Sequence, residues 1–447
     1  MEEKKKVVMG DEGIYDAKVL GTGKMLVLGF QHVFAMFGAT VLVPLITGLS
    51  VSTTLLMAGL GTLLFHLVTK GKVPAFLGSS FAFLGGFAIV APKLVDEAGN
   101  SIPNTEMLPY ACGGVVAAGL VYVVVALLIH VFGVKKVMKF FPPIVTGPII
   151  ISIGLILAPS AISNAATNWL LAVIALATIV VCNIWGKGMV KIIPILLGVL
   201  VSYAVALVMG AVDFTPIANA QFVGSPLIPS SFAKFEIGAI LTILPIALAA
   251  MMEHIGDVAA ISATCGKNFI ADPGLARTLL GDGLATSMAG FFGGPANTTY
   301  GENTGVLALT KVYDPKVVRI AAVVAIVLSL SPKFDAIVNT IPTAIIGGIS
   351  LILYGMISAV GVRNVVENQV DFTKSRNLII AAVILVSALG FNSVGGLTIF
   401  SNDSLTISLS GLAIAAILGI ALNAILPGND YEFGKDLQGD TSANLQV

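Results

Sequence analysis

Long apolar segments separated by short polar loops constrain this chain more than any other feature. Only 11% of the residues are charged and 56% are hydrophobic, whereas a soluble domain carries about a quarter charged residues. We therefore expect an all-α polytopic membrane protein, although several segments are too short to cross ~30 Å of hydrocarbon alone. A window of ~19 residues places about fourteen segments near 25–48, 52–69, 74–91, 108–134, 140–158, 168–186, 190–210, 236–262, 277–293, 300–312, 317–332, 336–362, 377–391 and 405–427.

The basic residues test this map, because Lys and Arg collect in cytoplasmic loops. If the N-terminus is cytoplasmic, all but three of the 24 basic residues fall on the inside, the exceptions being Lys93, Lys234 and Lys333. A miscounted segment would invert every later loop and remove this bias. The distribution predicts an even number of spans in the cytoplasmic membrane, with both termini in the cytoplasm.

Charge and cysteine content exclude several classes of partner. The net charge is zero, which gives no reason to expect binding to nucleic acid. The first residues are polar and lack the apolar core of a cleavable signal peptide, so we expect the first span to act as the insertion signal. Cys112, Cys182 and Cys265 are isolated, and their spacing predicts neither a disulfide, a metal site nor a bound cofactor.

A polar interval at about 211–235, with Pro216, Pro226 and Pro229, divides the segments into seven and seven. An odd number of spans in each half makes the second half enter the membrane from the opposite side. This is the inverted repeat of many secondary transporters. The sequence thus predicts two inverted repeats of seven segments each.

The third segment of each half is short and interrupted. Residues 73–88 read VPAFLGSSFAFLGGFA, and residues 294–308 read GPANTTYGENTGVLA. Such paired segments point to a substrate site near the membrane midplane. We predict a strand of four to six residues followed by a half-helix in segments 3 and 10, with the two strands antiparallel. The alternative is that Gly and Pro loosen two ordinary helices, since membrane helices tolerate both.

Three acids in apolar surroundings are the main candidates for function, because charge inside a bilayer is costly. Glu253 and Asp257 are four residues apart and share one helix face. Their mutual repulsion and burial would leave at least one of them protonated near neutral pH. The alternative places this pair in water at the cytoplasmic end of the helix. Glu302 begins the second half-helix, where free N–H groups also favour an anion or a carbonyl oxygen.

The start of the first half-helix contains Ser79, Ser80 and Phe81. Phe81 could present its ring and its backbone N–H to a planar ligand, or it could be an ordinary core or lipid-facing residue. Carboxylates, N–H donors and an aromatic wall together suit a small, neutral, planar ring such as uracil. Gln31 and His32 either support this site through hydrogen bonds or stabilise local helix packing. Four other polar residues are interpreted more simply: His254 as a packing or supporting residue, and His66, His130 and Asp282 as interfacial.

Several stretches resemble the bacterial uracil permeases of the nucleobase–ascorbate transporter family, also described as nucleobase–cation symporters. The stretches are QHVFAMFGATVLVP, KGKVPAFLGSSFAF, EHIGD, DPGLARTLLGDGLAT and NTTYGENTGVLALTKVY, within about residues 25 to 427. The resemblance implies a core domain from segments 1–4 (25–134) and 8–11 (236–332). It also implies a gate domain from segments 5–7 (140–210) and 12–14 (336–427), through which the chain forms a homodimer.

The resemblance also implies roles for individual residues. Glu253 and Glu302 would bind the N–H groups of the base, Phe81 and Gly301 would donate backbone N–H groups to its carbonyls, and Tyr300 would flank it. Family members that transport purines or xanthine commonly carry an amide at the position of Glu302, so a carboxylate favours a pyrimidine.

One departure concerns coupling, because close relatives often read EHxGH where this chain reads EHIGD. Asp257 therefore replaces a histidine implicated in proton coupling. We expect a uracil–proton symporter, not an enzyme, with Glu253 and Asp257 as the proton-sensitive pair. A xanthine or dual uracil–xanthine permease and Na⁺ coupling remain alternatives. Two hypotheses come from other classes of protein. An ion channel or anion exchanger of the same fold would be expected to have basic residues at the half-helix starts, which this sequence lacks. An intramembrane enzyme would need a nucleophile–base pair, which is not apparent either.

Overall fold

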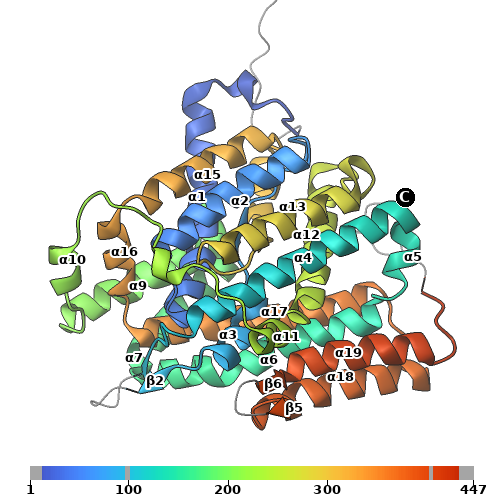
Figure 1. Cartoon of the computed structure of the whole chain (residues 1–447). Coiled ribbons are helices and arrows are strands. Elements are labelled where there is room, and N and C mark those ends of the chain that lie inside the picture. Colours follow the sequence, from blue (N-terminus) through green and yellow to red (C-terminus); the bar gives the residue numbers. More distant parts are fainter. Residues whose placement is uncertain (1–12, 96–100, 402–405, 432–447) are drawn as a thin grey trace, which may run out of the picture.

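The computed structural model describes residues 13–95, 101–401 and 406–431, and these residues form a mostly helical molecule (Figure 1). The elements of the first half are η1 (Ala17–Leu20), α1 (Thr22–Thr47), α2 (Val51–Val68), β1 (Leu77–Ser79), η2 (Phe81–Phe83), α3 (Leu84–Val90), β2 (Leu94–Val95), β3 (Ser101–Ile102), α4 (Leu108–Phe132), α5 (Val134–Met138), α6 (Pro143–Ala166), α7 (Trp169–Trp185), α8 (Met189–Ile192) and α9 (Pro194–Val208).

The connection and the second half follow the same order of long helices. They comprise α10 (Thr215–Asn219), η3 (Pro229–Ser231), α11 (Ile237–Ile243), α12 (Ile246–Cys265), η4 (Ile270–Gly274), α13 (Leu275–Phe291), β4 (Asn297–Thr299), α14 (Glu302–Thr310), α15 (Pro315–Ser329), α16 (Pro332–Asn339), α17 (Thr343–Glu367), α18 (Ser375–Ser393), β5 (Leu397–Ser401), β6 (Thr406–Leu409) and α19 (Gly411–Ile425).

Seven helices in the described ranges are long and apolar enough to cross a membrane, and α15 with α16 forms a further candidate bent by 89°. Four apolar helical stretches of 10–17 residues accompany them, among them Phe81–Val90 at the first interrupted segment. The chain is therefore a multi-pass membrane protein. The count of fourteen spans stays a prediction, because several of the segments are shorter than a full crossing.

The packing of the two halves corresponds element by element. By order in the chain, α2, α4, α6, α7 and α9 of the first half correspond to α13, α15, α17, α18 and α19 of the second. Helix α4 packs on α13, and the corresponding pair α15 and α2 also packs together. Helix α7 packs on α9 and α18 packs on α19 in the same way, and α6 packs on its own counterpart, α17. Figure 1 shows α2, α13 and α4 side by side, with α18 and α19 together at the opposite edge. Exchanging the halves preserves these pairs, as expected when both halves share one internal arrangement.

Three local expectations were inaccurate. Strands β1 and β4 have three residues each, fewer than the four to six expected. The segment expected at 336–362 starts inside α16, because α17 begins only after Pro342, and prolines favour the first turn of a helix. The segment expected at 405–427 begins instead with β6, whose Thr-Ile-Ser-Leu run alternates as strands do, and Ser410 then caps α19.

Candidate functional site

The two interrupted segments meet in a two-stranded antiparallel sheet formed by β1 and β4. Leu77 lies opposite Thr299, and Ser79 lies opposite Asn297. The ladder continues at both ends, since Ser80 N–H donates to Ala296 O (2.9 Å) and Tyr300 N–H donates to Phe76 O (2.9 Å). Both strands are buried. Because lipid cannot form hydrogen bonds with backbone groups, each strand satisfies the backbone N–H and C=O groups of the other.

Two threonines attach this sheet to the long helices beside it. Thr62 on α2 accepts a hydrogen bond from Leu77 N–H (2.9 Å), and Thr286 on α13 donates to Asn297 O (2.9 Å). Asn297 also donates through Nδ2 to Met57 O (2.7 Å), although the residues are 240 positions apart. The two threonines come from α2 and α13, which occupy corresponding places in the two halves, and together they hold both strands in position.

The sheet sets where the two half-helices begin. The first begins at Phe81, after Ser80, and the second begins at Glu302, after Gly301; no side chain caps either start. The first N–H groups of a helix have no partner inside that helix. Helix α12 packs against η2, β4 and α14, so it lies beside both starts. Two sets of N–H donors therefore lie close to one carboxylate-bearing helix.

The three acids expected from the sequence are brought together at this place. Asp257 Oδ2 accepts a hydrogen bond from Thr299 Oγ1 (3.0 Å), and a Cβ atom at Gly301 would lie 3.2 Å from Asp257 Oδ1. Glu253 is one helical turn from Asp257 on α12, and α12 packs against α14, which begins at Glu302. All three acids are partly exposed, so ligand or water can reach them.

A buried pair, His254 and Asp282, lies behind Asp257; His254 was expected to pack or to support the site, but its pairing with Asp282 was not predicted. The Thr299 hydroxyl, which donates to Asp257, lies 3.2 Å from His254 Nδ1, and His254 Nδ1 lies 3.3 Å from Asp282 Oδ2. Asp282 Oδ1 accepts the Thr299 N–H at 3.0 Å. Thr299 Oγ1 therefore lies between Asp257 Oδ2 and His254 Nδ1 and joins the two side chains.

The interpretation of Asp282 as interfacial was wrong, since both its side chain and that of His254 are fully buried. His66, also expected at the interface, is 2% exposed. The spacing between Asp282 and Thr286 could have indicated that Asp282 is buried near the site. Thr286 lies four residues further along the same helix face, toward β4.

Tyr300 is held against the sheet. Its hydroxyl donates to Ser79 O (3.0 Å) and lies 3.3 Å from Thr40 Oγ1. A Cβ at Gly78 would lie 2.5 Å from the Tyr300 ring, so only glycine fits beneath it. The hydroxyl is thus already engaged, and any contact of Tyr300 with a ligand would come from the ring.

The supporting residues expected from the sequence lie around the same half-helices. Asn303, which follows Glu302, donates through Nδ2 to His32 Nδ1 (3.1 Å) and His32 O (3.2 Å), and so joins α14 to α1. Gln31 Oε1 and Ser80 Oγ are buried, with no hydrogen-bond partner among the described residues. Unsatisfied buried oxygens are uncommon and call for water or ligand.

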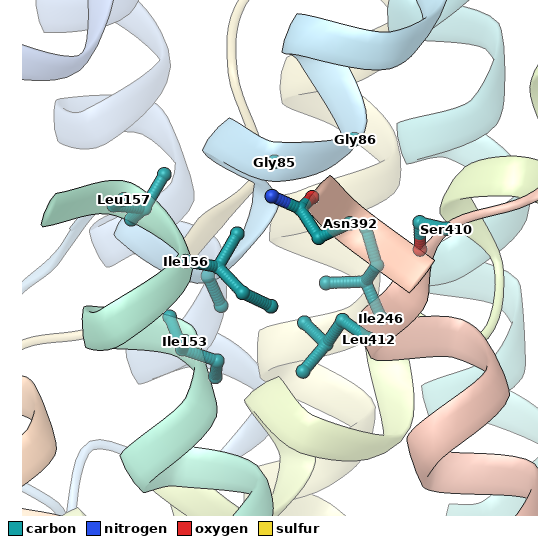
Figure 2. A pocket seen from close by; sticks show the side chains of 10 residues that line it. Gly85, Gly86, Ile153, Ile156, Leu157, Ile246, Asn392, Ser410 and Leu412 are labelled. Atoms are coloured by element: carbon teal, nitrogen blue, oxygen red, sulfur yellow. The ribbon is translucent and has the colours of Figure 1, made fainter. Parts of the chain in front are cut away.

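A narrow crevice separates these half-helices from the other group of helices. Figure 2 shows Gly85 and Gly86 of α3 and Ile246 of α12 facing α6, α18 and α19 across it. Asn392 and Ser410 supply its polar groups. Its volume of about 10 Å³ admits about one water, so the two groups are nearly in contact here. No group of three or more His, Cys, Asp or Glu residues within the described ranges is placed to hold a metal ion.

Comparison with solved structures identifies the fold. The transmembrane domain of the cyanobacterial bicarbonate transporter BicA matches with a TM-score of 0.63 at 17% identity, covering 86% of this chain and 98% of that one. The murine anion transporter Slc26a9 in its inward-facing state matches with a TM-score of 0.64 at 11% identity, covering 95% and 73%. At these identities the likeness defines the fold, which is one that membrane transporters use.

Sequence comparison gives the family. Residues 23–395 match the model described as the Permease family, and the chain belongs to this family. A uracil permease from Bacillus caldolyticus is 42% identical over 91% of this chain and 93% of its own length. The uracil permease of Escherichia coli strain K12 is 40% identical over 89% and 90%. The family and these relatives are permeases and not enzymes, as the sequence predicted.

Proposed function

We propose that this chain imports uracil across the cytoplasmic membrane together with a proton. The observation that carries the proposal is the pairing of β1 with β4, which brings the starts at Phe81 and Glu302 beside Glu253 on α12. The names of the similar permeases support uracil as the substrate. The pairing supports a single site between the two halves of the chain.

The proposed site matches the base group by group. Uracil presents two ring N–H donors and two carbonyl oxygens in one plane. Glu253 and Glu302 accept from the N–H groups, and the N–H groups of Phe81 and Gly301 donate to the carbonyls. The Tyr300 ring borders the base from the side of the sheet. Ser80 and Gln31 offer their buried oxygens to bound water, and His32 joins α1 to α14 through Asn303. No cationic side chain is required, because the base is neutral.

Proton coupling is assigned to Glu253 and Asp257. Two carboxylates one turn apart, with Glu302 nearby, cannot all be charged at low cost, so a proton enters with the base and reduces the repulsion. Thr299 and His254 connect Asp257 to Asp282 and hold its carboxyl group in place. In this chain Asp257 takes the part that a histidine takes in close relatives.

Transport proceeds by alternating access in this proposal. The core domain (25–134 and 236–332) carries the site past the gate domain (140–210 and 336–427), and the gate domains of two chains form a homodimer. Fourteen spans in two inverted repeats leave both termini in the cytoplasm. The crevice beside Ala82 and Ile246 supports this division, because it lies between α3 and α12 on one side and α6, α18 and α19 on the other.

Glu302→Gln tests the site. The amide keeps the volume but places an N–H₂ donor where the base requires an acceptor, so we expect uracil affinity to fall about ten-fold or more. Binding of labelled uracil to the purified protein measures this, with Glu367→Gln, which is in an exposed ion pair with Arg363, as the matched control. Unchanged affinity in Glu302→Gln would remove Glu302 from the site.

Uptake into proteoliposomes tests the coupling. An imposed inward proton gradient without Na⁺ should drive accumulation of labelled uracil, and a protonophore should abolish it. A requirement for Na⁺ would instead favour Na⁺ coupling. We keep this alternative because Asp257 replaces the histidine that close relatives carry at this position. Competition with xanthine separates a uracil permease from a dual uracil–xanthine permease.

A further inference from the structure

A second hollow, away from the sheet, opens among the loops that follow α2, α12 and α14. Its volume is about 570 Å³, within the range of ~300–1,000 Å³ found for small-molecule sites. Tyr15 from the N-terminal segment and Arg319 from α15 complete its lining. We call it the basic hollow, and its position is on the cytoplasmic side if the topology is as predicted.

The basic hollow has more positive than negative charge. Four cations (Lys72, Lys267, Lys316 and Arg319) and two carboxylates (Asp272 and Asp314) line it. Lys72 pairs with Asp272, and Lys316 pairs with Asp314 and with Asp16 outside the lining.

Two of these cations lack a counter-ion. No carboxylate among the described residues lies within 4.0 Å of Lys267 or Arg319. Arg319 uses its Nε to donate to His66 Nδ1 at 3.3 Å, and Lys267 Nζ lies 4.2 Å from the centre of the Tyr15 ring. Both cations are therefore available to an anion.

Aromatic rings lie beside these cations. The rings of Tyr15 and Tyr313 are 5.4 Å apart, centre to centre, with their planes tilted by 55°, and Tyr15 is 46% exposed. A cytoplasmic excess of Lys and Arg is expected in any membrane protein. That rule does not account for a hollow of this size in which unpaired cations and at least partly exposed aromatic rings occur together.

We propose that the basic hollow binds a phosphate ester. Lys267 and Arg319 hold the phosphate through charge-assisted hydrogen bonds, and the organic part lies against Tyr15 and Tyr313. A soluble nucleoside monophosphate and the headgroup of an anionic phospholipid share this chemistry. The aromatic rings fit the nucleotide better, because a base can stack on them. This site is independent of the proposed transport of uracil.

The basic hollow is connected to the sheet through one histidine. His66, which receives the Arg319 hydrogen bond, donates from Nε2 to Ala75 O at 2.8 Å, two residues before β1. A ligand that orders Arg319 therefore also orders the backbone that leads into β1. Binding should stabilise the folded protein by an amount that rises with ligand concentration.

The test uses the full-length chain in nanodiscs of zwitterionic lipid. Adenosine monophosphate, inorganic phosphate and adenosine are titrated by calorimetry, because a purine nucleotide separates this site from a uracil site. We expect the nucleotide to bind, phosphate to bind more weakly and adenosine not to bind. Lys267→Gln with Arg319→Gln should lower nucleotide affinity about ten-fold or more.

The matched control is Lys333→Gln. Lys333 also lies 4.2 Å from the centre of an aromatic ring, that of Phe222, but outside the basic hollow, so nucleotide affinity should be unchanged. If the double variant does not fold, Lys267→Gln alone, in an exposed loop, should still lower the affinity about three-fold or more.

A second arm replaces part of the zwitterionic lipid with phosphatidylglycerol. Thermal stabilisation by this lipid that is lost in the variant would identify a lipid as the source of the phosphate, and nucleotide binding that is lost in the variant would identify a soluble one. Either result supports the proposal. Responses to nucleotide and lipid that are the same in wild type and in the folded variant would overturn it.

Discussion

Replacing Thr299 by Val tests the connection between the sheet and the acids. Valine is also β-branched and suits a strand, and the backbone bonds of Thr299 to Asp282 and its pairing with Leu77 do not involve the hydroxyl. The change removes the hydroxyl that donates to Asp257 and lies 3.2 Å from His254 Nδ1. It therefore separates the hydroxyl from the position of the strand.

The expected size of the effect follows from the surroundings of Asp257. A hydrogen bond to a charged group contributes about 1.5–3 kcal/mol. Asp257 is partly exposed, so water replaces part of this bond, and a loss of about 1.4 kcal/mol corresponds to a ten-fold effect. We expect kcat/KM for labelled uracil uptake into proteoliposomes to fall about ten-fold, with little change in thermal stability.

Two further variants make this test specific. Thr299→Ser keeps the hydroxyl and should restore most of the uptake. Thr298→Val changes the neighbouring buried threonine, whose side chain points to the other face of the strand, and should leave uptake near the wild-type rate. Wild-type uptake in Thr299→Val, or an equal loss in Thr298→Val, would refute the role given to the hydroxyl.

Two predictions concern stability, measured by thermal unfolding in detergent. Gly61→Ala would place a Cβ atom against the Asn297 amide and should lower the free energy of unfolding by about 2–4 kcal/mol. The control Gly85→Ala places its Cβ atom in open space and should leave stability unchanged. Equal effects of the two substitutions would contradict the packing argument. Asp282→Ala leaves the buried Thr299 N–H without its acceptor and should cost about 1–3 kcal/mol. Asp282→Asn keeps an acceptor and should cost less, and an equal loss would show that the hydrogen bond is not the cause.

Many properties of the candidate site could be predicted from local sequence. Glu302 was expected at the start of a half-helix because a polar, Gly-containing run precedes an apolar one, and α14 does begin at Glu302. Glu253 and Asp257 were expected on one helix face from their spacing, and both lie on α12. These predictions succeeded because each depends on a few neighbouring residues.

Contacts between distant residues could not be predicted in the same way. Asp282 was expected at an interface and is fully buried, because its partners Thr299 and His254 come from other elements. The engagement of the Tyr300 hydroxyl by Ser79, 221 residues away, also left no pattern in the sequence. The hairpin of β5 and β6 was missed for a different reason. Its short alternating run adjoins an apolar helix, and that helix dominates the average hydrophobicity of a ~19-residue window.

The sequence by itself determined that this protein lies in a membrane, that its apolar segments divide into two comparable halves and which acids are candidates for its site. Those properties follow from the free-energy cost of placing polar groups in lipid. Each segment meets this cost through its own composition, independently of its neighbours. Only the tertiary structure decided that β1 pairs with β4, that the acids lie beside two uncapped helix starts and that a histidine and an aspartate support them from behind. The strand pairing depends on packing of the two halves against each other, and the histidine and aspartate are placed by packing between separate elements of the second half.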